Sequence, residues 1–218
     1  MPPTGVGAAF ADALAERGLN VVLLARRQAV LDDVAASIRQ RYGVETRTLA
    51  IDLAVSGAAA SVIDATADLE VGFLVYCAGA DPPDFTPFLS NSIAAAETMV
   101  QRNCVVPMQL SHHYAAPPWS SGGRGGIVVF GSGAGFVGGP PNMVAYGASK
   151  AFDMVFAEAL WSELHDKGVD VIGSSSARPT HLRCASSNTN AAHSRPRTRC
   201  RPTRYPSGGT SCPRRSPT

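Results

Sequence analysis

The fold of this chain is decided by Gly126-Ile-Val-Val-Phe-Gly-Ser-Gly-Ala-Gly135 and, after a short loop, Ala145-Tyr-Gly-Ala-Ser-Lys-Ala151. The apolar run 127–130 lies between glycines, which is typical of a fully buried strand in a parallel sheet. Ser132 follows the carboxyl end of this strand, where open α/β sheets place their functional residues. Apolar residues at helical spacing predict a helix from about Ala145. Tyr146 and Lys150 are four residues apart and share one face of that helix.

Tyr146 and Lys150 together favour acid–base chemistry. A tyrosine side chain ordinarily has a pKa of about 10, so it exchanges protons at neutral pH only when its ionised form is stabilised. The ammonium group of a lysine one helical turn away provides that stabilisation. Ser132 would hold a substrate oxygen beside the phenol. The alternative is that Tyr146 anchors a helix start and Lys150 is a solvated surface residue, but the preceding strand and serine favour the catalytic interpretation.

This segment resembles the short-chain dehydrogenase/reductase family, in which a serine after the fifth strand is followed by Tyr-x-x-x-Lys. Ser132, Tyr146 and Lys150 match the family's catalytic residues, and Asn103 matches a helix asparagine that holds a water in the proton relay to the lysine. The resemblance covers residues 4–173. It implies hydride transfer between a nicotinamide cofactor and a small carbonyl or alcohol substrate. It also implies an α/β fold, a Rossmann-like doubly wound parallel sheet with helices on both faces.

The glycines near the N-terminus indicate a dinucleotide site. Gly5 and Gly7 open a predicted helix, where backbone N–H groups can approach a pyrophosphate. They match the last two glycines of the family's longer pattern, whose first glycine and first strand have no counterpart in this sequence. We therefore expect a sheet that lacks both its first and its last strand.

The next predicted strand, 21–25, carries information on cofactor preference. It ends in Arg26-Arg27 with no acidic residue, and arginine at this place binds the 2′-phosphate of NADP, whereas NAD sites use a carboxylate. The sequence therefore favours NADP(H) over NAD(H), although two solvated arginines at a helix start are the plain alternative. The resemblance implies further cofactor contacts at Asp52, Leu53, Ala78, Gly79, Tyr146 and Lys150.

The remaining elements follow from apolar periodicity. We expect helices over 28–42, 58–69 and 93–114, with a kink at Pro107, and strands over 44–51, 71–77 and 169–172. The resemblance implies a homodimer or homotetramer that pairs through the helices 93–114 and 145–165.

The composition of the 218-residue chain changes near residue 173. Residues 1–173 hold seven more acidic than basic residues, whereas 174–218 hold nine arginines, no acid and no Val, Ile, Phe, Met or Trp. Such a segment buries too little apolar surface to offset its ordering. We predict an incomplete dinucleotide-binding domain over 1–173 and a disordered tail over 174–218. We hypothesise a shifted reading frame after about codon 173 and a late start codon, which the coding DNA would test.

Other classes of protein find little support in the sequence. No apolar run reaches the roughly 18 residues of a membrane helix, and no basic-then-apolar leader opens the chain, so we expect a cytoplasmic protein. The cysteines and histidines lack metal-ligand spacing. Two alternatives to an active NADP-dependent reductase remain. The first is a truncated, non-catalytic product without a competent cofactor site, and the second, the least favoured, is nucleic-acid binding through the basic tail.

Overall fold

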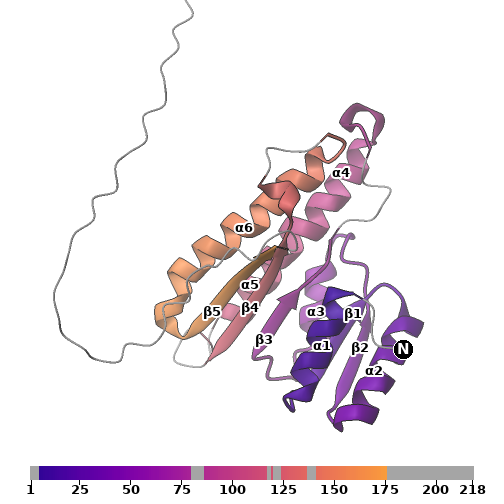
Figure 1. Cartoon of the computed structure of the whole chain (residues 1–218), viewed down its shortest axis with the longest axis vertical. Coiled ribbons are helices and arrows are strands. Elements are labelled where there is room, and N and C mark those ends of the chain that lie inside the picture. The colour runs from indigo at the N-terminus through magenta and orange to yellow at the C-terminus, as the bar shows by residue number, and fades with distance from the viewer. Residues whose placement is uncertain (1–4, 80–85, 117–118, 120–123, 137–140, 176–218) are drawn as a thin grey trace, which may run out of the picture. The chain divides into compact units, whose positions relative to one another are not determined.

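The computed structural model describes residues 5–79, 86–116, 119, 124–136 and 141–175. Strands and helices alternate along most of this part of the chain, and every strand pair is parallel. Alternation of this kind gives an α/β fold, because each parallel crossover carries a helix onto a face of the sheet. The expected fold class is therefore confirmed (Figure 1).

The larger sheet has three strands in the order β3-β4-β5. They are β3 (Phe73–Tyr76), β4 (Gly125–Gly131) and β5 (Val169–Ser175). β4 lies in the middle and has four almost fully buried residues in succession, 126–129, as expected of a strand covered on both faces. Ile127 is in register with Leu74 on one side and with Val171 on the other.

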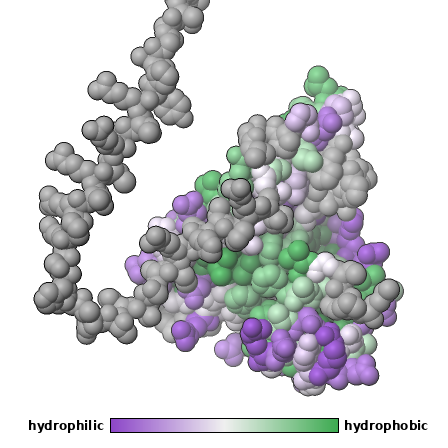
Figure 2. All heavy atoms as spheres, viewed as in Figure 1, coloured by the Kyte–Doolittle hydropathy of each residue, from purple (hydrophilic) through white to green (hydrophobic). Residues whose placement is uncertain are grey.

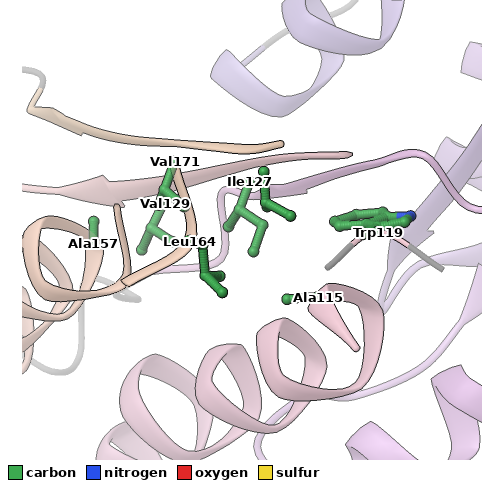
Figure 3. Close-up of a cluster of buried hydrophobic side chains, with 8 residues drawn as sticks. Ala115, Trp119, Ile127, Val129, Ala157, Leu164 and Val171 are labelled. Atoms are coloured by element: carbon green, nitrogen blue, oxygen red, sulfur yellow. The ribbon is translucent and has the colours of Figure 1, made fainter. Parts of the chain in front are cut away.

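One face of this sheet packs against α5 (Val106–Ala115) and α6 (Val144–Leu164). Figure 3 shows side chains of β4 and β5 lying against those of the two helices and Trp119. The indole Nε1 of Trp119 also donates a hydrogen bond to the carbonyl of Val71, at 2.7 Å. The opposite face receives α1 (Val6–Glu16), whose Phe10 ring meets the Phe130 ring edge-on at 5.4 Å. Helices thus lie on both faces.

The smaller sheet pairs β1 (Val21–Ala25) with β2 (Thr46–Ala50). It packs against α1 and α2 (Gln28–Tyr42) through a second apolar cluster. The helix α2 ends at Gly43, which has a φ of 69°. Glycine is the usual residue at such a helix end, because its backbone adopts this left-handed conformation without steric cost.

β1 and β3 belong to different sheets, and among the residues described no strand joins them. They are linked by side chains instead: Leu24 of β1 packs against a third apolar cluster that includes Leu53, Tyr76 and Val106. The helix α3 (Ala58–Ala65) contributes to the same cluster. This division agrees with the expectation of a sheet without its first strand. Figure 2 shows apolar residues, in green, at the surface in the middle of the face in view.

The helix expected over 93–114 is divided into three parts. α4 (Ile93–Val100) leads into the π-helical turn η3 (Gln101–Val105), and α5 follows from Val106. Pro107 has no N–H group to give to the carbonyl four residues earlier, so a regular α-helix is interrupted there. The expected kink at Pro107 is therefore a wide turn just before it, and this turn buries Arg102 and Asn103.

The predicted bounds differ from the observed ones at several other ends. The strands 44–51 and 71–77 are shorter, at 46–50 and 73–76, whereas the strand expected over 169–172 continues to Ser175 because it pairs with β4 as far as Gly131. The helix expected to reach residue 69 ends at Ala65. At its end the Oγ1 of Thr66 donates a hydrogen bond to the carbonyl of Val62 and shares a second one with the hydroxyl of Tyr114. Residues 176–218 lie outside the described part, so the predicted disorder of the tail stays a prediction.

Candidate active site

Seven of the predicted site residues follow the carboxyl ends of strands in the two parallel sheets. Arg26 and Arg27 follow β1, Asp52 and Leu53 follow β2, Ala78 and Gly79 come after β3, and Ser132 follows β4. This edge of a parallel sheet is where α/β proteins bind their ligands, because crossover loops and helix N-termini open there.

Ser132 lies directly after β4 in an extended conformation, with φ −150° and ψ 156°. Its Oγ accepts a hydrogen bond from the N–H of Ala134 at 3.3 Å and so caps the short 3-10 turn η5 (Gly133–Gly135). Gly135 in this turn packs directly on the backbone of α6 at Lys150 and Ala151. The serine loop and the helix that carries Tyr146 and Lys150 are therefore held against each other.

Tyr146 and Lys150 lie in the first two turns of α6. Tyr146 is half-buried, and Lys150 is buried. The side chain of Lys150 is only 4% exposed. Its Nζ donates to the carbonyl of Phe130 at 2.7 Å and to Oδ2 of Asp153 at 2.8 Å. The ammonium group is thus attached to the end of β4, two residues before Ser132.

Asp153 is a residue of this region that the sequence reasoning missed. It is 1% exposed, lies three residues after Lys150 on α6 and forms an ion pair with it. Burial raises the pKa of its carboxyl to about 6, and the positive charge of Lys150 opposes that rise. The available signal was an acidic residue at i+3 from the lysine within an otherwise apolar helix segment.

Asn103 is fully buried in the π-helical turn η3. Its Nδ2 donates to the Oγ of Ser149 at 2.9 Å, and its Oδ1 accepts from the Nε of Arg102 at 3.3 Å. Ser149 lies next to Lys150 and donates to the carbonyl of Tyr146 at 2.9 Å. Asn103 is therefore tied to the helix of the candidate catalytic residues through Ser149, and its role in a proton relay stays a prediction.

Gly5 and Gly7 begin α1 in the manner of an anion site. Gly5 has a φ of 109°, which side-chain-bearing residues rarely adopt, and no side chain caps the helix start in the part of the chain described. A Cβ at Gly7 would lie 3.4 Å from the Cβ of Cys77, so the helix start sits close to the end of β3. Uncapped N–H groups at a helix start suit a phosphate ligand. These residues therefore fit the pyrophosphate of a dinucleotide.

The other predicted cofactor residues differ in exposure. Arg26 and Arg27 are exposed, and Arg27 occupies the position before α2. Asp52 is also exposed, and its Oδ1 accepts from the N–H of Ala54 at 2.9 Å. Leu53, in contrast, is 8% exposed and belongs to an apolar cluster, so it offers a ligand its backbone at most.

Ala78 and Gly79 are half-buried and follow Tyr76, the last residue of β3, and Cys77. The hydroxyl of Tyr76 donates to the carbonyl of Arg102, which ties β3 to η3. Burial raises the pKa of the Tyr76 hydroxyl and raises that of the Cys77 thiol to about 11, so both are neutral at pH 7.

In the described residues no group of three or more His, Cys, Asp or Glu side chains is placed to hold a metal ion. No helix in the same residues combines the length and apolar character needed to cross a membrane.

Comparison with known proteins finds relatives that are all named as dehydrogenases or reductases. The chain is 36% identical over 167 residues to the 7β-hydroxysteroid dehydrogenase of Collinsella aerofaciens, a match that covers 77% of this chain and 62% of that protein. It is 32% identical over 173 residues to the very-long-chain 3-oxoacyl-CoA reductase of Macaca fascicularis, covering 77% and 54%. The chain therefore spans between about half and two thirds of the length of these relatives.

Structural comparison agrees with the sequence matches. A short-chain dehydrogenase from Sphingobium yanoikuyae, solved in complex with NADPH, superposes with a TM-score of 0.72 at 32% identity, over 78% of this chain and 66% of that one. The family model described as short chain dehydrogenase matches residues 3–179. On this evidence the chain belongs to the short-chain dehydrogenase/reductase family of oxidoreductases.

Proposed function

We propose that this protein transfers hydride between NADP(H) and a carbonyl or alcohol substrate, with Ser132, Tyr146 and Lys150 as catalytic residues. The observation that carries the proposal is the buried Nζ of Lys150, bonded to the carbonyl of Phe130 at 2.7 Å and therefore fixed beside the strand end that Ser132 follows. A buried lysine charge at the carboxyl edge of a parallel sheet is costly, and such sites are commonly functional.

Each catalytic side chain has a separate task. Tyr146 gives a proton to the developing alkoxide in reduction, or removes one from the alcohol in oxidation. The ammonium of Lys150 stabilises the phenolate that Tyr146 passes through. Ser132 donates a hydrogen bond to the substrate oxygen and orients it. Asn103 supports the same helix through Ser149 and is proposed to hold the water that links Lys150 to solvent. The nicotinamide supplies or accepts the hydride when it is bound.

The preference for NADP(H) is proposed from the end of β1. Arg26 and Arg27 are exposed there with no acidic residue beside them in sequence, so the position offers positive charge to a 2′-phosphate. Gly5 and Gly7 would place the start of α1 at the pyrophosphate. Asp52, Ala78 and Gly79 would line the adenosine side, and Leu53 would contribute through its backbone.

The substrate class is proposed from the named relatives. One is named for a hydroxysteroid and the other for a very-long-chain 3-oxoacyl-CoA, and both compounds carry a large apolar part, a steroid ring system or a very long acyl chain, beside the alcohol or carbonyl group. A screen of ketosteroids and 3-oxoacyl thioesters with NADPH is therefore the first choice.

One observation favours the alternative of a chain without a competent cofactor site. Arg26 and Arg27 follow a strand of the two-stranded sheet, whereas Ser132 follows a strand of the three-stranded sheet, and no described strand joins the two. A cofactor that contacts both ends needs them held together. In the described residues two contacts provide this: α1 packs on the smaller sheet and meets Phe130 through Phe10, and Leu24 packs on the third apolar cluster.

Fluorescence titration with NADPH and with NADH separates these possibilities. We expect saturable binding that favours NADPH, and Arg26→Ala should weaken NADPH binding by about 10- to 100-fold, the loss of one charge-assisted bond, while changing NADH binding little. Arg17→Ala, which removes an exposed arginine elsewhere, is the matched control. Tyr146→Phe should retain NADPH binding and lose about 10²- to 10⁴-fold in turnover. Binding of neither cofactor by the folded parent would establish the alternative.

A further inference from the structure

The buried ion pair between Lys150 and Asp153 has a feature that the proposed chemistry does not account for. Both side chains are almost completely removed from solvent, at 4% and 1% exposure. Oδ2 of Asp153 accepts from Lys150, whereas Oδ1 has no hydrogen-bond partner within the described part of the chain. A buried carboxylate with an unused oxygen is destabilising for the fold, so packing alone gives no reason for an acid at this position.

The groups around the pair include a phenol, two thiols and the guanidinium of Arg102. Among the described residues, Tyr76 of β3 and Cys104 of η3 interact electrostatically with Asp153, and Cys77 and Cys104 interact with Lys150. Burial raises the pKa of Cys104 as well as that of Cys77 to about 11, so neither thiol carries charge at pH 7. The positive charge of Arg102 acts on Tyr76. Asp153 therefore provides the negative charge that faces Lys150.

A buried ammonium without a negative partner gives up its proton far more easily than one in water. The pair also fixes the orientation of the ammonium group, because Asp153 and the carbonyl of Phe130 accept hydrogen bonds from two of the three N–H groups of Lys150. The group is thereby held against the end of β4 with one proton left to donate.

We propose that Asp153 is a positioning residue, which keeps the ammonium group of Lys150 charged and oriented for the reaction proposed above. This inference rests on the proposed function for its purpose, although the ion pair itself can be tested without cofactor or turnover. Asp153 touches neither substrate nor cofactor in this account, and it acts only through Lys150.

The lysine content of the chain makes a direct measurement practical. Lys150 and Lys167 are its two lysines, so protein labelled with ¹³C-lysine gives two ε-CH₂ signals, and Lys167→Arg leaves that of Lys150 alone. In this background we expect the Lys150 signal to show a small step near pH 6, where the neighbouring Asp153 titrates.

Asp153→Asn keeps the shape of the side chain and removes its charge. In this variant the step near pH 6 should vanish, and the Lys150 signal should move toward the position of a neutral amine between pH 7 and 9. Asp170→Asn, the same change at an exposed position of β5, is the matched control and should reproduce the parent. A Lys150 signal that stays charged to pH 9 in Asp153→Asn, or that moves equally in Asp170→Asn, would overturn the proposal.

The parent protein gives a second test that needs no Asp153 variant to fold. Absence of the step near pH 6 in its Lys150 signal also overturns the proposal. Kinetics then connect the pair to the reaction: Asp153→Asn should lower kcat by about 10- to 100-fold, the effect of a slightly misplaced catalytic group, with little change in the KM of the carbonyl substrate. The loss should be larger at pH 9 than at pH 7, because the Asp153→Asn variant lacks the negative charge that favours the ammonium form of Lys150. If the parent shows no turnover, the proposed function fails while the lysine signals still decide on the ion pair.

Discussion

Replacing Gly135 by alanine tests the contact that holds the serine loop on α6. A Cβ built at Gly135 would lie 2.7 Å from the nitrogen of Ala151, 2.8 Å from the carbonyl carbon of Lys150 and 3.0 Å from the Cα of Ala151. All three are backbone atoms of the helix, so no flexible side chain can swing away to make room. Ordinary contact begins at 3.4 Å, and the turn η5 must therefore move away from α6 by several tenths of an ångström.

The expected cost follows from that displacement. Inserting a methyl group into a well-packed site costs about 1–3 kcal/mol, and the rigidity of the helix backbone places Gly135→Ala in the upper half of this range. With a urea m value of about 2 kcal/mol per M, the unfolding midpoint should fall by about 1 M. Because Ser132 begins the displaced turn, turnover should fall as well, by up to about 100-fold.

Urea unfolding followed by circular dichroism measures the stability effect. Gly72→Ala is the matched control, because a Cβ there meets nothing within 4 Å and the position has no positive φ. This control should unfold at the parent midpoint or slightly above it, since alanine lowers the entropy of the unfolded chain. Equal midpoints for Gly135→Ala, Gly72→Ala and the parent would refute the close approach of η5 and α6.

Two further changes address the support of the site and the tail. Ser149→Ala leaves the Nδ2 of the buried Asn103 without its acceptor and should lower the free energy of unfolding by about 1–3 kcal/mol, whereas Ser61→Ala on an exposed helix position should change it by less than about 0.5 kcal/mol. A chain that ends at residue 175 should unfold at the parent urea midpoint, and neither it nor the full chain should bind duplex DNA. Binding by the full chain alone that weakens steeply with salt would instead support the nucleic-acid alternative.

The bounds of a helix or strand were predictable where the local sequence signals and the tertiary packing favour the same ends. β1 and α2 have the predicted bounds, because a buried apolar run is cut off by Arg26-Arg27 and the following helix ends in a glycine with positive φ. Less of α4 and α5 was predictable. The apolar periodicity of the sequence predicts which helix faces are buried. It does not predict that the missing N–H of Pro107 makes residues 101–105 a π-helical turn.

The candidate site shows a similar limit. The positions of Ser132, Tyr146 and Lys150 follow from the strand–loop–helix pattern, since that pattern fixes which residues reach the carboxyl edge. Asp153 was missed because an acid at i+3 from a lysine is usually an exposed helical pair. Only the packing of α6 against β4 and η3 reveals that this pair is buried.

The division between β1 and β3 also affects how the protein behaves in solution. A strand edge without a partner presents a row of free N–H and C=O groups that another chain can use as a template. β1 reads Val-Val-Leu-Leu-Ala, an uncharged apolar segment without proline, and its pairing within the described residues is on one side only, with β2. Segments of this kind promote intermolecular β-pairing. Non-native association should therefore grow with protein concentration, and low concentration during refolding favours recovery of the folded protein.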